Sequence, residues 1–524
     1  MVFRSAAYGS WFLLAVLASG AVGAKDAVAP FEAAGSFVAA NPIDEILLKV
    51  WKKEGLVPAH LCSDEVYLRR VYLDLTGTLP TVAEVRAFRE DESVDKRAAV
   101  VERLFARPEF ADYWSLRWCD VLRVKAEFPI NLWPNAVQAY HRWVHDAMRT
   151  NQPYDQFARA LLTTSGSNYR DPAVNFYRAI QGKTKGTIAQ AVALTFMGIR
   201  LEKWPEGQRE GMEAFFSRVI FKPTAEWKEE IVMLDPAART PLKAVFPDGA
   251  ETTVPAGTDP RRVFADWLIR VENPWFARAA VNRQWFWLFG RGIVHEADDM
   301  WSEQPPVSPE LLDYLAGELV ASGYDTRHVL RLIVASRTYQ QSAIPQGDPA
   351  RAEILFACYP VRQLEAEVLV DALMQVFGPG EEYSSPIPEP FTFIPATQRS
   401  VALADGSITS PFLELFGRPA RDTGLLAERH SRASDGQRLH MLNSSHIQNK
   451  IERGWGLKDI GREAGNEPGE VVRMVYESLL SRAPTPLELI AAGTYAKQPG
   501  ISRTQALADL AWALVNSKEF LYRH

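Results

Sequence analysis

The sequence predicts a mainly α protein with two helical domains, joined by a short Pro-rich connector that holds at most a small β hairpin. A length of 524 residues, 47% of them hydrophobic, is enough for two or three globular domains with substantial cores. Apolar residues recur at helical spacing before residue 220 and again after residue 258, and prolines interrupt the stretch between. We therefore expect an N-terminal helical domain at 40–220, a connector at 221–258 and a C-terminal helical domain at 259–522.

Helix start signals mark the first domain. Thr81 with Glu84 three residues later forms a capping box, and Asp95 can cap the next helix, which ends before Pro108. The stretch 188–196 is small and apolar enough for a buried helix. The other residues expected on buried helix faces are Val85, Phe88, Val100, Val101, Leu104, Phe105, Val137, Tyr140, Val144 and Met148.

The connector consists of short apolar pieces separated by Pro223, Pro236, Pro241 and Pro255. Asp248-Gly249 is a favoured hairpin turn, so at most a small hairpin is expected there.

The second domain resumes the helical pattern. Ser308, Pro309 and Glu310 supply an N-cap, a first-turn proline and a first-turn acid, and Asp325 begins the next helix. Residues 378–411 are rich in Pro, Gly and Ser, which predicts an irregular excursion over the surface.

Thr485 and Glu488 form a second capping box, preceded by proline like the first. An internal repeat would explain the echo, but the same residues are a general helix start, and we favour that explanation.

Residues 1–24 have the pattern of a secretory signal peptide. Arg4 precedes an apolar run at 11–17, and small residues end at Ala24. The run is shorter than the roughly 20 residues of a membrane-spanning helix, so cleavage is favoured over an uncleaved anchor. No later stretch is apolar enough to span a bilayer. We expect an exported protein, periplasmic or extracellular.

Composition excludes several classes of protein. A formal net charge of -6 gives no reason to expect nucleic-acid binding. Three cysteines, Cys62, Cys119 and Cys358, are too few and too far apart for a thiolate metal site or a redox dithiol. Cys119 lies in an aromatic string and is expected to be a buried thiol, whereas a bridge between Cys62 and Cys358 stays open.

The best acidic candidate is Asp298-Asp299, flanked by Glu296 and Glu303. Such carboxylates could share acid and base work or hold a hard cation. Because the cluster follows the glycine turn at 290–292, we expect an exposed loop, on which ion pairing with nearby arginines is the alternative to a site.

A second polar group follows between predicted helices, at 418–422, 428–430 and 440–443. Arginines beside carboxylates suit either a structural ion-pair network or a pocket for phosphate or sulfate. Together with the acidic pair, these stretches define a candidate polar pocket formed by Asp298, Asp299, Arg418, Arg421, Glu428, Arg429, His440 and Asn443.

Two other patterns favour structure over chemistry. His141 and His145 lie one helical turn apart, but a zinc protease would need Glu where Arg142 stands, and no third ligand is near. Sugar stacking is the alternative to a core role for a set of tryptophans on mostly apolar stripes: Trp114, Trp118, Trp133, Trp143, Trp267, Trp275, Trp285, Trp287 and Trp301.

Blocks of sequence along nearly the whole mature chain resemble two uncharacterised families. Residues 69–81, Arg-Arg-Val-Tyr-Leu-Asp-Leu-Thr-Gly-Thr-Leu-Pro-Thr, resemble domain of unknown function 1549. The chain resembles domain of unknown function 1553 at 273–278, 281–283, 289–294, 298–299, 309–313, 323–325, 336–340, 416–419 and 516–520. The two are usually fused and abound in exported proteins of planctomycete-type bacteria.

The chain departs from its relatives where they carry potential ligands. Their Cys-x-x-Cys-His segment is missing between Gly198 and Trp204, and their Cys-x-Cys-Glu-Arg is Leu-Leu-Ala-Glu-Arg at 425–429. Their Ser-His-Pro-Glu is Val-Ser-Pro-Glu at 307–310. We therefore predict no metal and no cofactor.

The resemblance implies proteins that are often fused to cytochrome c domains and encoded beside sulfatase-like proteins. Our first hypothesis is a cofactor-free partner of a sulfatase-like protein or an envelope polysaccharide assembly. The alternative is a polysaccharide hydrolase that uses Asp298, Asp299 and the polar group around Arg421, Glu428 and His440. A haem or redox protein is disfavoured because covalent haem attachment needs the missing cysteines.

Overall fold

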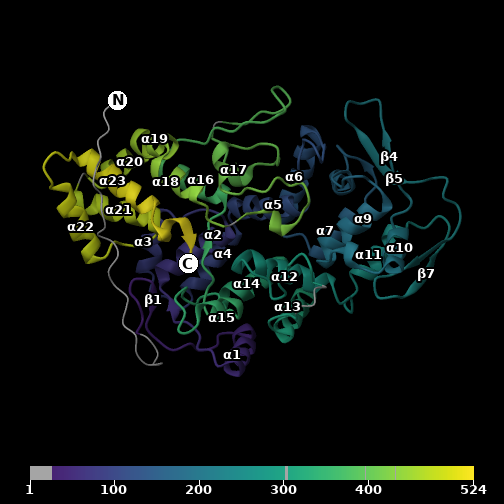
Figure 1. Ribbon diagram of the computed structural model, residues 1–524, viewed down its shortest axis with the longest axis horizontal. Coiled ribbons are helices and arrows are strands. Elements are labelled where there is room, and N and C mark those ends of the chain that lie inside the picture. The colour runs from purple at the N-terminus through teal and green to yellow at the C-terminus, as the bar shows by residue number, and fades with distance from the viewer. Residues whose placement is uncertain (1–25, 301–304, 396, 431, 466) are drawn as a thin grey trace.

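The computed structural model describes residues 26–300, 305–395, 397–430, 432–465 and 467–524 (Figure 1). Helices dominate this part of the chain, and its strands form only two- and three-stranded sheets, so the predicted mainly α class is confirmed. Every helix within these ranges is too short or too polar to cross a bilayer. The expected signal peptide at 1–24, Glu303 and Trp301 lie outside the described residues.

The N-terminal region, residues 26–214, begins its helices where the sequence predicts. Thr81 Oγ1 accepts a hydrogen bond from Glu84 N at 3.3 Å, and Glu84 Oε2 accepts one from Thr81 N at 2.8 Å. Asp95 stands before its helix without a capping hydrogen bond from its side chain. The elements are β1 Glu32–Ala33, α1 Pro42–Glu54, β2 Leu61–Cys62, α2 Asp64–Leu75, α3 Val82–Glu90, α4 Lys96–Phe105, α5 Pro108–Val121, α6 Pro134–Arg149, α7 Tyr154–Thr163, β3 Gly166–Ser167, η1 Pro172–Val174, α8 Asn175–Arg178, α9 Lys185–Val192, η2 Ala193–Met197, η3 Leu201–Lys203 and α10 Glu206–Ala214.

The connector holds two hairpins, whereas the sequence predicts at most one. The hairpin at Asp248-Gly249 joins β6 (Leu242–Val245) to β7 (Glu251–Val254). A second pairs β4 (Val219–Pro223) with β5 (Glu230–Leu234), and β3 adds a third strand at its edge. The sequence pattern does not predict this sheet, because β3 comes from far upstream and is only two residues long. Both hairpins project from one end of the molecule (Figure 1).

The C-terminal region, residues 259–524, again shows the expected caps. Ser308 Oγ accepts from Leu311 N at 3.2 Å, Asp325 Oδ1 accepts from Arg327 N at 2.8 Å, and the Thr485 capping box forms. Its elements are α11 Pro260–Leu268, α12 Phe276–Phe289, α13 Pro309–Ala321, α14 Thr326–Ala335, α15 Pro349–Ile354, β8 Arg362–Gln363, α16 Ala366–Phe377, η4 Ser400–Ala402, α17 Pro411–Leu415, η5 Leu426–Glu428, α18 Asp435–Asn443, α19 Ser445–Arg453, α20 Gly456–Glu463, α21 Pro468–Leu480, α22 Pro486–Ala496, α23 Arg503–Val515, α24 Lys518–Leu521 and β9 Tyr522–Arg523.

The long segment between α16 and α17 has little regular structure, as its composition predicts; η4 is the one short helix described there. Parts of it are nonetheless buried, among them Glu381, Ile387 and Val401. It therefore runs partly under the surface as well as over it.

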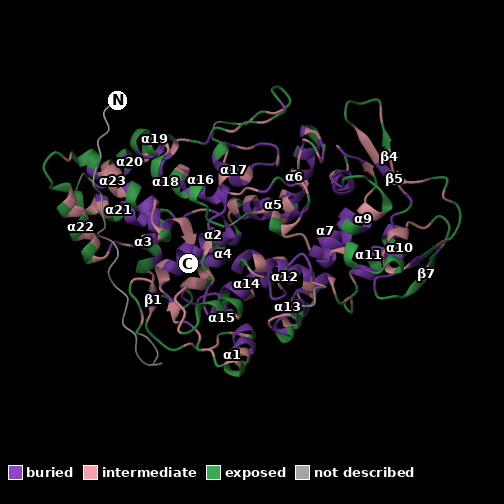
Figure 2. Ribbon diagram, in the orientation of Figure 1, coloured by how far each residue is buried: buried purple, intermediate pink, exposed green. Residues whose placement is uncertain are grey.

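The two regions share one apolar core. Their buried side chains form a single continuous cluster, and burial runs through the middle of the molecule without a break (Figure 2). In that core the indole of Trp287 on α12 lies 5.6 Å, centroid to centroid, from both Trp114 and Trp118 on α5. The last strand, β9, pairs with β8, and Arg523 within it is buried.

Candidate functional site

Three of the eight candidate side chains come together in the interior. Arg421 Nε donates to Asp120 Oδ1 at 2.9 Å, and Arg429 Nη2 donates to Asp120 Oδ2 at 2.7 Å. Arg429 Nη1 also donates to Glu367 Oε2 at 2.6 Å, and Arg418 Nε lies 3.5 Å from the other oxygen of that carboxylate. The loop between α17 and α18 thus delivers three guanidiniums to carboxylates on α5 and α16.

These pairs continue into a larger network. Glu365 pairs with Arg117 and with Arg523, and Asp74 pairs with Arg523 and with Arg362. No side chain of the network is more than 13% exposed. We call it the arginine–carboxylate core; it consists of Asp74, Arg117, Asp120, Arg362, Glu365, Glu367, Arg418, Arg421, Arg429 and Arg523.

The arginines keep two carboxylates of the core, Glu365 and Asp120, charged. Burial works to raise the pKa of Glu365, but the charges of Arg117 and Arg523 outweigh it and hold that pKa well below its ordinary value. At Asp120 burial also works to raise the pKa, but the charges of Arg429 and Arg421 outweigh it, so the pKa is lowered. Carboxylates that release their protons so readily are poor general acids near neutral pH. The arrangement suits a structural link between the two regions.

Asp298 and Asp299 are buried, not exposed as the sequence suggested. Asp298 Oδ2 accepts a hydrogen bond from Leu426 N in η5 at 2.6 Å, and Asp299 forms an ion pair with Lys203 of η3. These distant segments cover the acidic pair, which is why the glycine turn before it misled the prediction. Burial raises the pKa of Asp298, although the charge of Arg283 opposes it. Within the described residues, Oδ1 of each carboxylate has no hydrogen-bond partner.

The remaining candidates lie in other sets of contacts. Glu428 accepts from the backbone nitrogens of Asp422 and Thr423, at 2.9 Å and 3.3 Å, and so shapes the loop that carries the arginines. His440 and Asn443 lie on α18, not between helices as expected. The sequence signal for this helix was the capping box of Ser434 and Gln437, three residues apart.

His440 belongs to a small histidine–glutamate cluster. Its Nε2 lies 3.3 Å from His446 Nδ1, and His446 Nε2 lies 2.9 Å from Glu381 Oε2. Lys450 Nζ lies 3.2 Å from the same oxygen. Burial lowers the pKa of His440, and the neighbouring His446 adds to the effect. Asn443 is exposed at the end of α18.

The other histidines and the cysteines singled out in the sequence have structural contacts in the fold. His141 and His145 stack with ring centroids 6.1 Å apart, and His145 Nε2 lies 3.2 Å from Asp112. The described residues contain no group of three or more His, Cys, Asp or Glu side chains that could hold a metal ion. Cys62, Cys119 and Cys358 are buried free thiols, which confirms the expectation for Cys119 and answers the question of a Cys62–Cys358 bridge.

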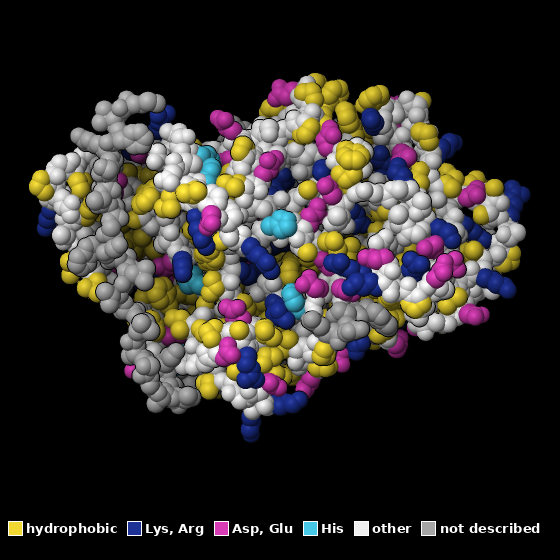
Figure 3. All heavy atoms as spheres, viewed as in Figure 1, with side chains coloured by type: hydrophobic (Ala, Val, Ile, Leu, Met, Phe, Trp, Pro, Cys, Tyr) yellow, Lys and Arg dark blue, Asp and Glu magenta, His cyan; other side chains and the backbone are white. Residues whose placement is uncertain are grey.

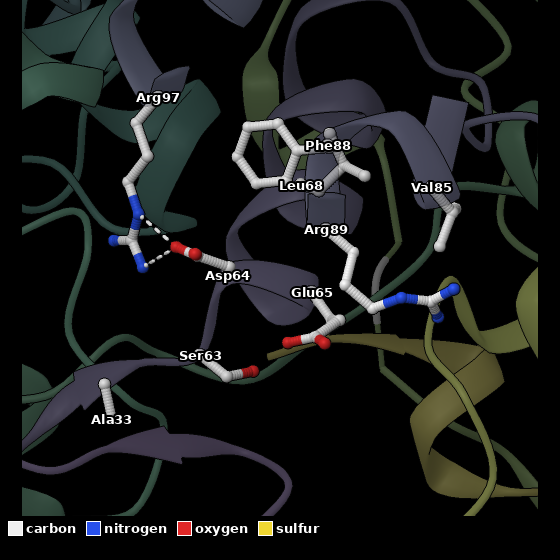
Figure 4. A pocket seen from close by; sticks show the side chains of 9 residues that line it. All are labelled: Ala33, Ser63, Asp64, Glu65, Leu68, Val85, Phe88, Arg89 and Arg97. Atoms are coloured by element: carbon white, nitrogen blue, oxygen red, sulfur yellow. Dashed lines mark hydrogen bonds and ion pairs between the residues drawn. The ribbon is translucent and has the colours of Figure 1, made fainter. Parts of the chain in front are cut away.

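A cavity of about 350 Å³ opens beside α2, away from every candidate residue (Figure 4). Its wall is apolar at Leu68, Val85 and Phe88, and its rim is charged. The rim charges are largely satisfied: Asp64 pairs with Lys96 and Arg97, and Arg89 with Glu477. The cavity is near the lower limit of ligand pockets in size, and Asp64, Arg89 and Arg97 on its rim already form ion pairs within the fold.

Aromatic side chains gather on the surface where three loops meet. The ring of Trp133 lies 6.2 Å from Trp227 in the β4–β5 turn and 5.5 Å from Phe391 in the segment before α17. Lys228 Nζ stands 5.2 Å and 5.4 Å from the two indole rings. Figure 3 shows one face of the molecule, on which hydrophobic side chains are exposed among charged ones. We call Trp133, Trp227, Lys228 and Phe391 the aromatic loop surface.

The core role predicted for the tryptophans is confirmed for Trp114, Trp118, Trp267, Trp285 and Trp287, which are all buried. Trp133 is only partly buried, and Trp227, which the sequence pattern did not single out, is 68% exposed. Its signal was its place between Glu226 and Lys228 in a short polar turn.

Comparison with known families identifies both parts of the chain. The family model PSCyt2, a protein of unknown function (DUF1549), matches residues 42–202, and PSD1, a protein of unknown function (DUF1553), matches residues 260–496. No curated protein and no solved structure matches the chain. The chain therefore belongs to the proteins that combine a DUF1549 domain with a DUF1553 domain.

Proposed function

We propose that this chain is an exported, cofactor-free binding protein that works in an envelope polysaccharide assembly. One contrast carries the proposal. The arginines and carboxylates that could do chemistry neutralise one another in the interior, whereas aromatic side chains that suit sugar rings are exposed on loops. Export itself rests on the signal-peptide pattern, and the polysaccharide context rests on the family resemblance.

A binding assay with a catalytic readout tests this function. The mature chain, residues 25–524, is titrated with soluble polysaccharides, and both retardation in a native gel and release of reducing ends or sulfate are measured. We expect retardation without release. If the chain binds no polysaccharide but co-purifies with a sulfatase-like protein, its binding partner is that protein and not a polysaccharide. Rapid release of sugar or sulfate would contradict a binding role.

The hydrolase alternative has one observation in its favour. Asp298 is a buried carboxyl whose pKa is raised, and its neighbour Asp299 is paired with a lysine. Adjacent carboxyls in such different surroundings can divide the roles of acid and base. If the wild type does release sugar, Asp299→Asn should abolish release, and the exposed Glu296→Gln in the same segment should not. Equal loss in both variants, or in neither, would remove the acidic pair from the site.

A further inference from the structure

The aromatic loop surface combines side chains from three separate parts of the chain. Trp133 precedes α6, Trp227 is in the turn between β4 and β5, and Phe391 follows the proline-rich stretch after α16. Trp227 and Phe391 are 68% and 53% exposed, and the ring of Trp133 touches both. Tyr169 supports the arrangement from below, because its hydroxyl donates to Trp227 O at 2.7 Å. Three independent loops therefore hold aromatic rings at one place on the surface.

The backbone at this surface is also unusual. Trp133 has φ 72° and ψ 148°, a combination that residues with side chains rarely adopt, and Lys228 has a φ of 60°. Such conformations persist where the surrounding structure enforces them, and they concentrate at functional sites. Here they present an indole and an ammonium group at the surface.

The positive charge of Lys228 is the feature of this surface that suits an anion. Of the acids in this turn, Glu229 is bound by Ser167 and Thr224 and Glu230 by Arg178 and Lys183, whereas Glu226 is exposed. Across the described residues, no carboxylate lies within ion-pair distance of Lys228. Its ammonium rests over the rings of Trp133 and Trp227 instead. A ligand with an acidic group would supply the missing partner.

We propose that the aromatic loop surface binds an anionic polysaccharide. The C–H face of a sugar ring stacks on the exposed indole of Trp227, with Trp133 edge-on beside it, and Lys228 donates to a sulfate or carboxylate of the same chain. Phe391 extends the contact to a neighbouring sugar. This inference rests on the proposed binding function and specifies where the sugar lies and what charge it carries.

Soluble oligosaccharides prepared from carrageenan and alginate, which are anionic, and from agarose, which is nearly uncharged, separate the two parts of the contact. Dissociation constants are measured by isothermal titration calorimetry on the mature chain. We expect tighter binding to the anionic probes. Trp227→Ala should weaken binding to them about tenfold, the amount that one lost aromatic contact implies. Lys228→Gln should remove the preference for the anionic probes.

Trp455→Ala is the matched control, because Trp455 is 58% exposed but lies beside α20, far along the chain from the three loops. It should bind as the wild type does, and circular dichroism should show the same helicity for all variants. Undiminished binding by Trp227→Ala and Lys228→Gln would overturn this site while leaving a binding function intact. Failure of the wild type to bind either anionic probe would overturn both.

Discussion

The interior and the loop surface of this protein reverse the usual placement of residue types. In the arginine–carboxylate core, charges lie in the middle of the molecule and hold α2 and α5 against α16 and the C-terminal strand β9. On the aromatic loop surface, large rings that normally fill cores are exposed. The comparison teaches that the polar stretches singled out in the sequence build the fold here, and the binding that we propose lies on loops outside those stretches.

The two regions also differ in how they respond to substitution. A buried ion pair adds little stability compared with an apolar pair of the same shape. Removing one partner is nevertheless costly, because the other charge stays buried without a counter-ion or water. An exposed ring has few contacts to lose. Substitutions in the core should therefore change stability, and those on the surface should change binding.

The largest effect is expected at Glu365, which lies between Arg117 and Arg523. Glu365→Gln keeps the shape and removes the charge, leaving Arg117 without its counter-ion and Arg523 with Asp74 alone. The free energy of unfolding should fall by about 3–5 kcal/mol, the range for a broken buried pair. Urea unfolding followed by circular dichroism measures it. A loss below about 1 kcal/mol would show that the arginine–carboxylate core does not hold the N-terminal and C-terminal regions together.

An acid-dependent effect is expected at His141 on α6. Burial, aided by the charge of Arg421, lowers its pKa to about 4 from an ordinary 6.5. The unfolded chain therefore takes up the proton first, and stability is lost as pH falls from 6.5 toward 4. The loss should reach about 2 kcal/mol between pH 7 and pH 5.

His141→Gln should lack this pH-dependent loss. Between pH 7 and pH 5 its free energy of unfolding, measured by urea titration, should therefore fall by about 2 kcal/mol less than that of the wild type. Identical pH dependence in the two proteins would mean that His141 is protonated as easily in the fold as outside it.

A smaller effect, with a diagnostic sign, is expected at Trp133. At an ordinary position a Gly variant is less stable than an Ala variant, but the φ and ψ of Trp133 suit glycine. Trp133→Gly should therefore be more stable than Trp133→Ala by about 1 kcal/mol. Thermal unfolding of both variants gives the sign. Phe391, with no positive φ, is the control and should show the ordinary order.

The smallest effect is expected for an exposed ion pair that also joins the two regions. Arg159 on α7 and Asp266 on α11 pair at 2.7 Å with side chains 40% and 62% exposed. Asp266→Asn should change the free energy of unfolding by no more than about 0.5 kcal/mol. A change as large as that of Glu365→Gln would show that crossing between the regions, and not burial, determines the effect.

Local structure could be predicted from the sequence because its signals are local. The capping residues Thr81, Ser308, Asp325 and Thr485 each begin a helix, since a cap and its partner lie within three residues. Asp95 fails as a cap because its backbone, at φ -99° and ψ 9°, does not aim the side chain at the helix.

The site was less predictable because its contacts are long-range. Arg421 and Arg429 were recognised as a polar group, but their partners Asp120 and Glu367 are far away in the chain. Asp298 was placed on an exposed loop because nothing near it announces that η5 packs over it. Trp227 is a single ring in a turn and forms no sequence pattern, because Trp133 reaches it only in the fold.

Hydrogen exchange with and without bound carrageenan oligosaccharide tests most directly whether the loops, and not the polar core, bind the ligand. We expect exchange to slow in the segments around Trp133, Trp227 and Phe391 and to stay unchanged at 295–300 and 418–430. Slowing confined to the segments that carry Asp298 and Arg421 would contradict the account and return the binding site to the polar core.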